Sequence, residues 1–152
     1  MNITAAQIKK IREETGAGMM RVKKVLEDVE GSEPKAIEIL KKEIGEKMEE
    51  RTQRTTSEGL LKTYIHHNGK LVAVVELLCE TDFVAKNDLF QSLASDLAMQ
   101  VASMGATTSN ELLEQDFIKD PSRKVQDLVK DVVGKTGENI SVGRVFRVEL
   151  GK

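Results

Sequence analysis

The stretch LLKTYIHHNGKLVAVVELL, residues 60–78, decides the fold of the larger part of this chain. Two runs of strand-forming residues lie on either side of Asn68-Gly69. Asn-Gly is the strongest short-range signal for a β-hairpin, because both central residues of a type I′ turn need a positive φ. The stretch therefore predicts two antiparallel strands joined at Asn68-Gly69.

The residues after this hairpin predict two helices and a returning strand. Asn87 can cap a helix that closes at Gly105, and Asp120-Pro121 can start another. The stretch NISVGRVFRVEL, residues 139–150, alternates like a strand, with Gly143 as a possible bulge. The expected apolar helix faces are Phe90, Leu93, Ala94, Leu97, Ala98, Val101 and Met104, and then Val125, Leu128, Val129, Val132 and Val133. Residues 59–152 thus predict an α+β core subdomain, with helices packed on one face of a three-stranded antiparallel sheet.

The residues before the hairpin predict a separate three-helix module, residues 1–46. Thr4 and Gln7 have the spacing of a capping box, and Gly16 can end the first helix. The second helix would place Val22, Val25, Leu26 and Val29 on one face, and the third, after Pro34, would place Ile37, Leu40 and Ile44 on one face before Gly45. Residues 47–58 are nearly all polar and are either a linker or a helix extension.

Between the first two helices lies TGAGMM, residues 15–20. Neighbouring residues on a helix differ in direction by about 100°, so Met19 and Met20 cannot both face one small core. We expect one of them to be exposed, where a flexible side chain suits an apolar hollow on another protein. The alternative is that both are partly buried as packing at the helix start.

Composition limits the function classes. The 152 residues include 23 Lys and Arg against 25 Asp and Glu, a net charge of −2, which argues against nucleic acid as the main partner. Cys79 is the one cysteine, so no internal disulfide is possible. No apolar run is long enough to span a bilayer, and no membrane partner is expected. We expect a soluble cytosolic protein.

No catalytic constellation is recognisable. His66 and His67 are adjacent in the predicted hairpin turn, where strand geometry would point them to opposite faces and make them poor metal ligands. Cys79 in an apolar strand is typical of a small buried hydrophobe. There is no phosphate-binding glycine loop and no Cys/His cluster. The sequence predicts neither an enzyme nor a protein with a cofactor.

TDFVAKN, residues 81–87, follows the second hairpin strand and allows two interpretations. Asp82 can be a turn former with Phe83 as a core ring beneath the next helix. Alternatively, both side chains are exposed at a strand end because a partner needs them.

Two motifs together resemble a known family. TGAGMM with Lys23 and Lys24, and TDFVAKN, resemble in order and spacing the two signatures of elongation factor Ts, the guanine-nucleotide exchange factor for elongation factor Tu. GENISVGR, residues 137–144, resembles the strand that closes the first half of that family's core. The resemblance runs from Ile3 to about Leu150.

The resemblance implies a fold and a mechanism. The first module would be a domain of the ubiquitin-associated (UBA-like) type that binds the nucleotide-binding domain of elongation factor Tu through Met19, Met20, Lys23 and Lys24. Thr81, Asp82, Phe83 and Val84 match the segment that the family pushes in beside the partner's magnesium ion. GDP and magnesium would belong to the partner, so this chain itself would need no cofactor and no metal.

Longer members of the family carry a second core half and a C-terminal helical module, so this chain resembles a short form. Its few-stranded sheet would have exposed edges, where a two-fold homodimer could form. Two rival functions stay open. One is a helical module that binds a different, non-GTPase protein, in which only Met19 and Met20 matter. The other is a small enzyme with Asp82, Glu80 and a histidine as acid and base, which requires a cleft.

Overall fold

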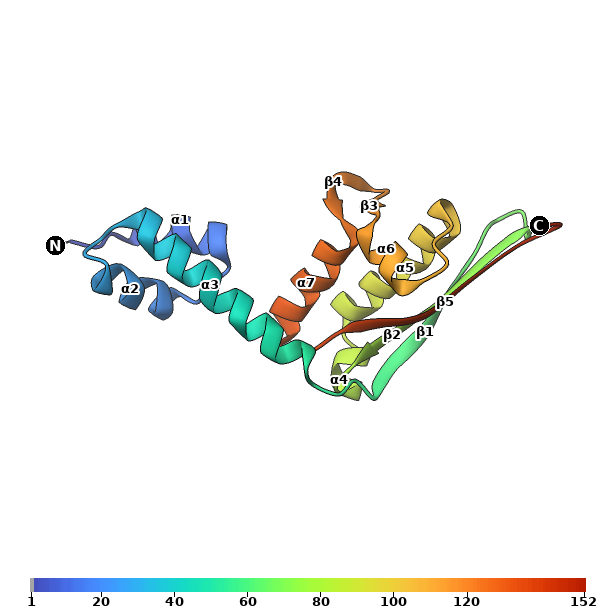
Figure 1. Cartoon of the computed structure of the whole chain (residues 1–152), viewed down its shortest axis with the longest axis horizontal. Helices are drawn as coiled ribbons and strands as arrows, with labels where there is room; N and C mark the ends of the chain where they lie inside the picture. The colour runs from blue at the N-terminus through green and yellow to red at the C-terminus, as the bar shows by residue number, and fades with distance from the viewer. Residues whose placement is uncertain (1) are drawn as a thin grey trace. The chain divides into compact units, whose positions relative to one another are not determined.

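The chain divides into two compact units, Met1–Glu50 and Arg51–Lys152. The computed structural model describes residues 2–152, and Figure 1 shows helices alone in the first unit and a sheet with helices in the second. The predicted α+β class is confirmed. The finer bounds 1–46, 47–58 and 59–152 stay a prediction.

The first unit consists of α1 (Ala5–Thr15), α2 (Met19–Asp28) and the start of α3 (Glu33–Thr52). The capping box of Thr4 and Gln7 is present, and Gly16 ends α1 in the left-handed conformation, as predicted. Helix α3 does not stop at Gly45 but continues to Thr52. The core of the unit is Ile11, Val22, Val25, Leu26, Ala36 and Leu40.

The second unit is built on the predicted three-stranded antiparallel sheet. Its strands are β1 (Glu58–Ile65), β2 (Leu71–Cys79) and β5 (Ser141–Glu149), in the order β1-β2-β5. Gly143 lies in the predicted bulge, since the β2–β5 register shifts between Val75 and Leu77.

Helices cover one face of this sheet (Figure 1). Alternate residues of β2, from Ala73 to Cys79, are buried on that face. They lie beneath α5 (Asp88–Met104), which Asn87 caps and Gly105 ends, as predicted. The other helices are α4 (Asp82–Ala85), α6 (Ser109–Glu114) and α7 (Val125–Thr136). Most of the predicted apolar helix faces are buried, although Met104 is 52% exposed.

Two local predictions are wrong. Asp120-Pro121 does not start a helix but lies in β4 (Asp120–Lys124), which pairs with β3 (Asp116–Phe117), and α7 begins only at Val125. A proline fits the first residues of such a short edge strand because no ladder amide is needed there. Neither α6 nor this small hairpin is predicted by the sequence pattern.

The β1–β2 turn is the second correction. Of Asn68 and Gly69, only the glycine has a positive φ, so the turn is not type I′. The Gly69 amide donates to the His66 carbonyl at 2.8 Å, which makes His67 and Asn68 the central residues of the turn. The rings of His66 and His67 lie 4.2 Å apart instead of pointing to opposite faces, because His66 is in the turn and outside the strand.

Candidate functional site

The TDF turn, which we define as Thr81, Asp82 and Phe83, directly follows β2. Thr81 is the N-cap of the four-residue helix α4, and its hydroxyl accepts from the Val84 amide at 3.4 Å. Val84 and Ala85 are buried and anchor α4 on the sheet side of the unit. The strand end, the cap and this anchor together determine the direction of the turn.

Phe83 is 85% exposed, the highest value among the large hydrophobic side chains of the described residues. The interpretation of Phe83 as a core ring is therefore wrong. Asp82 is also exposed, and its carboxylate lies 3.6 Å from the Lys86 ammonium group, which is exposed as well. The structure thus presents an acid and an aromatic ring to solvent, side by side in sequence at the start of α4.

A second segment of the chain, residues 138–139, forms hydrogen bonds with the TDF turn and with the residue before it. The Glu138 carboxylate accepts from the Glu80 amide at 3.1 Å, the Thr81 amide at 2.9 Å and the Thr81 hydroxyl at 2.6 Å. In return, the Glu80 carboxylate accepts from the Asn139 amide at 2.8 Å. Sequence reasoning missed these contacts, since nothing in GENISVGR indicates which amides Glu138 would meet.

Cys79 is fully buried beneath the same turn, as predicted for a small buried hydrophobe. Burial is the main cause that raises the pKa of its thiol to about 11, and the neighbouring Glu138 adds to the shift. The thiol donates to the Thr81 carbonyl at 3.1 Å. A neutral, inaccessible thiol is a packing group and not a nucleophile.

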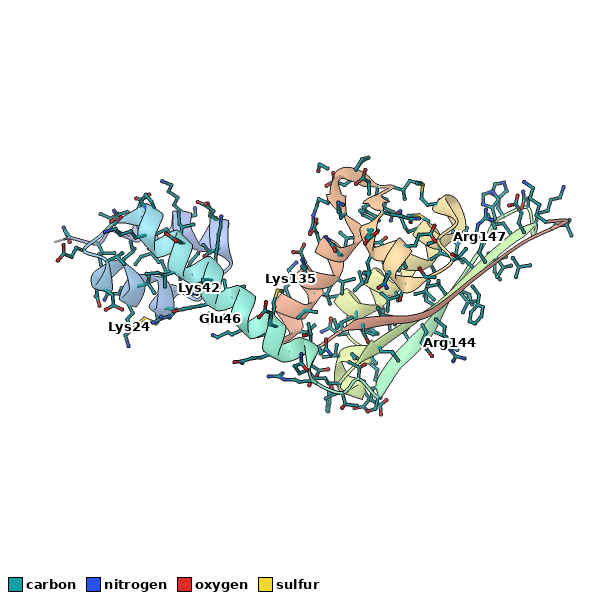
Figure 2. All side chains as sticks on the ribbon, in the orientation of Figure 1. Lys24, Lys42, Glu46, Lys135, Arg144 and Arg147 are labelled. Carbon is teal, nitrogen blue, oxygen red and sulfur yellow. The ribbon has the colours of Figure 1, made fainter. Side chains whose placement is uncertain are left out.

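The first unit presents a separate surface at the start of α2. Met19 is 55% exposed and Met20 is 70% exposed, so the expectation that one of them is exposed is confirmed, and the other is exposed as well. Lys23 and Lys24 are exposed one turn further along the helix, and Figure 2 shows Lys24 pointing away from the three-helix core. Val22, Val25 and Leu26 take the core side. We call Met19, Met20, Lys23 and Lys24 the α2 patch.

A shallow hollow beside the α2 patch is lined only by charged residues of α2 and α3: Arg21, Glu43, Glu46, Lys47 and Glu50. Arg21 forms an ion pair with Glu43, and hydrogen bonding to the guanidinium holds the pKa of that carboxyl below its ordinary value. No apolar residue in the described part of the chain lines this hollow, which is therefore unlike the mostly apolar pockets that bind small molecules.

No metal or membrane feature accompanies these surfaces. Among residues 2–152, no three His, Cys, Asp or Glu side chains are grouped closely enough to hold a metal ion. Within the same range, no helix combines the length and the apolar character needed to cross a membrane. The His66 Nδ1 atom lies 3.1 Å from the Tyr64 hydroxyl oxygen, so this imidazole has a hydrogen-bond partner in the neighbouring strand.

The sheet face opposite the helices is open and carries several large apolar side chains. Its exposed side chains include Leu61 and Ile65 of β1 and Phe146 and Val148 of β5, which are between 54% and 67% exposed. These pair in register with residues of β2 that share their face. Figure 2 shows Arg144 and Arg147 on opposite sides of β5: Arg144 joins Glu76 on the open face, and Arg147 donates to the Ala102 carbonyl of α5. We call this surface the open sheet face.

Comparison with known proteins links both units to one family. The family model described as "Elongation factor TS" matches residues 80–152, a range that begins directly before the TDF turn. Curated relatives extend the similarity over nearly the whole chain. A protein named "Elongation factor Ts" from Oleidesulfovibrio alaskensis is 38% identical, with 98% of this chain and 98% of the relative covered.

Other relatives carry the same name but differ in length. The Maridesulfovibrio salexigens protein is 38% identical over 100% of this chain and 96% of its own length. The Clostridium kluyveri protein is 42% identical over 99% of this chain, which covers 49% of that relative. This chain therefore matches some relatives from end to end and others over about half their length.

Proposed function

Since the chain belongs to the elongation factor Ts family of translation factors, we propose that it binds elongation factor Tu in its GDP form and speeds GDP release with the TDF turn. The observation that carries this proposal is the Phe83 ring, 85% exposed on a turn that is held by backbone contacts. An apolar ring kept in water at a rigid position suits insertion into a partner.

The chemistry of the partner's site explains how an acid and a ring could act there. A bound GDP is held by backbone amides around its phosphates and by Mg²⁺, which demands near-ideal octahedral geometry. Asp82 and Phe83, placed beside that site, would disturb the ion's coordination without binding the nucleotide. Thr81 and Val84 would complete the segment, one as cap and the other as anchor. No covalent bond is made or broken, so exchange requires no catalytic residue.

The energy required is modest. Weakening GDP binding a thousandfold needs a coupling free energy of about 4 kcal/mol. Burying one phenyl ring contributes about 1.5–3 kcal/mol, and a disturbed metal contact can supply the rest. The exposed pair therefore has enough interaction energy for the proposed effect.

The experiment is the release of a fluorescent GDP analogue from the matching elongation factor Tu, followed with the native chain and with Phe83→Ala and Asp82→Ala. We expect the native chain to speed release and each variant to lower the maximal rate by about 10- to 100-fold, the equivalent of one lost buried group. Ile118→Ala is the matched control, because Ile118 is also an exposed apolar residue, with 44% exposure. No acceleration by the native chain would overturn the proposal.

We propose that the α2 patch contributes to the affinity for elongation factor Tu and not to the maximal rate of GDP release. Exposed methionines fit an apolar hollow on a partner protein, and two exposed lysines favour acidic residues around that hollow. Met20→Ala should then raise the chain concentration needed for half-maximal release while leaving the maximal rate unchanged. The rival function, a helical module for a non-GTPase partner, predicts that Met20→Ala matters while Phe83→Ala and Asp82→Ala do not.

We further propose a homodimer formed through the open sheet face. The face carries several large apolar side chains that a second copy could cover by a two-fold operation. This differs from edge pairing, the expectation from the sequence. Phe146→Glu should shift the mass measured by sedimentation equilibrium from dimer to monomer; a native chain that is monomeric at micromolar concentration would contradict it. Neither nucleic acid nor a membrane is proposed as a partner, and a cytoplasmic location stays a prediction.

A further inference from the structure

The exchange residues themselves are not held in place by packing. Phe83 is 85% exposed, and the ion pair of Asp82 joins two exposed side chains. Their positions therefore depend on the backbone of α4, a helix of four residues. A helix of this length does not form by itself, because nucleation costs more than its few hydrogen bonds return. Contacts from outside α4 must hold its first turn.

Glu138 makes those contacts with both oxygens of its carboxylate. One oxygen accepts from the Glu80 amide at 3.1 Å and the Thr81 amide at 2.9 Å, and the other accepts from the Thr81 hydroxyl at 2.6 Å. The same hydroxyl accepts from the Val84 amide at 3.4 Å. A continuous chain of bonds thus runs from the carboxylate through the cap into the first turn of α4.

Glu138 is itself held in position. It follows Gly137, which ends α7 in the left-handed conformation with φ 76°. It precedes the buried Asn139, whose amide donates to Glu80 at 2.8 Å and whose side chain donates to the Arg54 carbonyl at 2.8 Å. The two segments brace each other, because each supplies a carboxylate to the backbone amides of the other.

From this geometry we propose that Glu138 is a positioning residue for nucleotide exchange. It keeps Thr81 in the cap conformation, so that Asp82 and Phe83 meet the partner already ordered. This inference rests on the proposed exchange function and adds to it a residue that never touches the partner's nucleotide. Ordering the turn before binding removes an entropic cost that would otherwise reduce the interaction energy available for exchange.

The test measures the maximal rate of fluorescent GDP release for Glu138→Ala and Glu138→Gln. Alanine removes all three bonds, whereas glutamine keeps an oxygen for the two amides. We expect about a tenfold lower maximal rate for Glu138→Ala, because the charge-assisted hydrogen bonds that hold the TDF turn are lost, and a rate near native for Glu138→Gln. Glu111→Ala is the matched control, since Glu111 also accepts from a threonine amide and hydroxyl, those of Thr107, but lies in the first turn of α6.

A double-mutant cycle separates positioning from general destabilisation. If Glu138 acts through Phe83, then Glu138→Ala should have little effect on release once Phe83→Ala is present. An equal slowing in both backgrounds, or a native rate for Glu138→Ala, overturns the proposal. The unfolding transition of each variant, followed by Tyr64 fluorescence, checks that the unit is folded.

An independent measurement distinguishes this failure from failure of the exchange function. Amide hydrogen exchange at Glu80 and Thr81 in the free chain should become faster in Glu138→Ala and stay slow in Glu111→Ala. If the native chain does not speed GDP release, both the exchange function and the positioning role are refuted, even where the Glu80 and Thr81 amides are protected. If the native chain is active and the amides exchange equally fast in all variants, only the positioning role falls.

Discussion

Gly59→Ala should destabilise the second unit more than any ordinary surface substitution. Gly59 lies inside β1 with φ 148°, opposite Leu78 of β2. A Cβ atom at this position would lie 2.1 Å from the Leu77 carbonyl oxygen and 2.9 Å from the Leu78 Cα. Both atoms belong to the backbone of the neighbouring strand, so no side-chain rotation can relieve the overlap.

The cost has two parts. A residue other than glycine in this region of φ costs about 1–3 kcal/mol. Moving β1 away from β2 also weakens a ladder hydrogen bond, at about 1 kcal/mol. We therefore expect Gly59→Ala to lower the free energy of unfolding by about 2–4 kcal/mol, a large part of the ~5–15 kcal/mol typical of a domain. Because Leu78 is close to the TDF turn, the same shift should also slow GDP release.

Urea unfolding followed by Tyr64 fluorescence measures this cost. Tyr64 is the one tyrosine of the chain, there is no tryptophan, and Tyr64 lies in β1 itself. Gly137→Ala is the matched control, because Gly137 has φ 76° but no atom beyond the adjacent residues lies within 4 Å of the place that an alanine methyl group would occupy; it should lose only about 1–2 kcal/mol. If Gly59→Ala loses no more than Gly137→Ala, the backbone overlap is not the cause and the reasoning is refuted.

Two further predictions concern stability. Gln100→Leu should lower the free energy of unfolding by about 2–3 kcal/mol, because it removes the buried amide that bonds the Asp116 carbonyl and the Ile118 amide; an unchanged urea midpoint would contradict this. For Glu43, bonding to Arg21 lowers the pKa in the folded state, so its contribution to stability is present above the ordinary value of 4.5 and is lost as pH falls through the lowered value. Thermal unfolding of the first unit should therefore shift less between pH 6 and pH 3 in Glu43→Gln than in the native chain, and an equal shift would argue against the pair.

Helix ends could be predicted because they depend on neighbouring residues. Thr4 with Gln7, and Asn87 with the helix it caps, satisfy amides a few positions away, so the pattern contains the whole interaction. The glycines that close α1 and α5 act equally locally. The helix predicted at Asp120-Pro121 is wrong because a short edge strand and the first turn of a helix both accept proline, and only pairing with β3 decides between them.

The candidate site could be predicted only in part. The residues of the TDF turn stand together in the sequence, but their exposure depends on what packs above them. Support from Glu138 comes from 57 residues away, and neither segment contains a local signal for the other. The hairpin turn shows the same limit, since Asn68-Gly69 located the turn correctly while the loop length set its geometry.

Because Phe83 is exposed, replacing it should change nucleotide exchange without changing the stability of this chain. Thermodynamic linkage then relates the effect on GDP binding to an affinity that can be measured. A ring that is 85% exposed contributes little to folding, so Phe83→Ala should change the free energy of unfolding by no more than about 0.5 kcal/mol. If the ring weakens GDP binding by some factor, then GDP must weaken binding of this chain by the same factor. Calorimetric titration of GDP-bound and nucleotide-free elongation factor Tu should show a large affinity ratio for the native chain. That ratio should shrink in Phe83→Ala, and an unchanged ratio would place the coupling elsewhere in the interface.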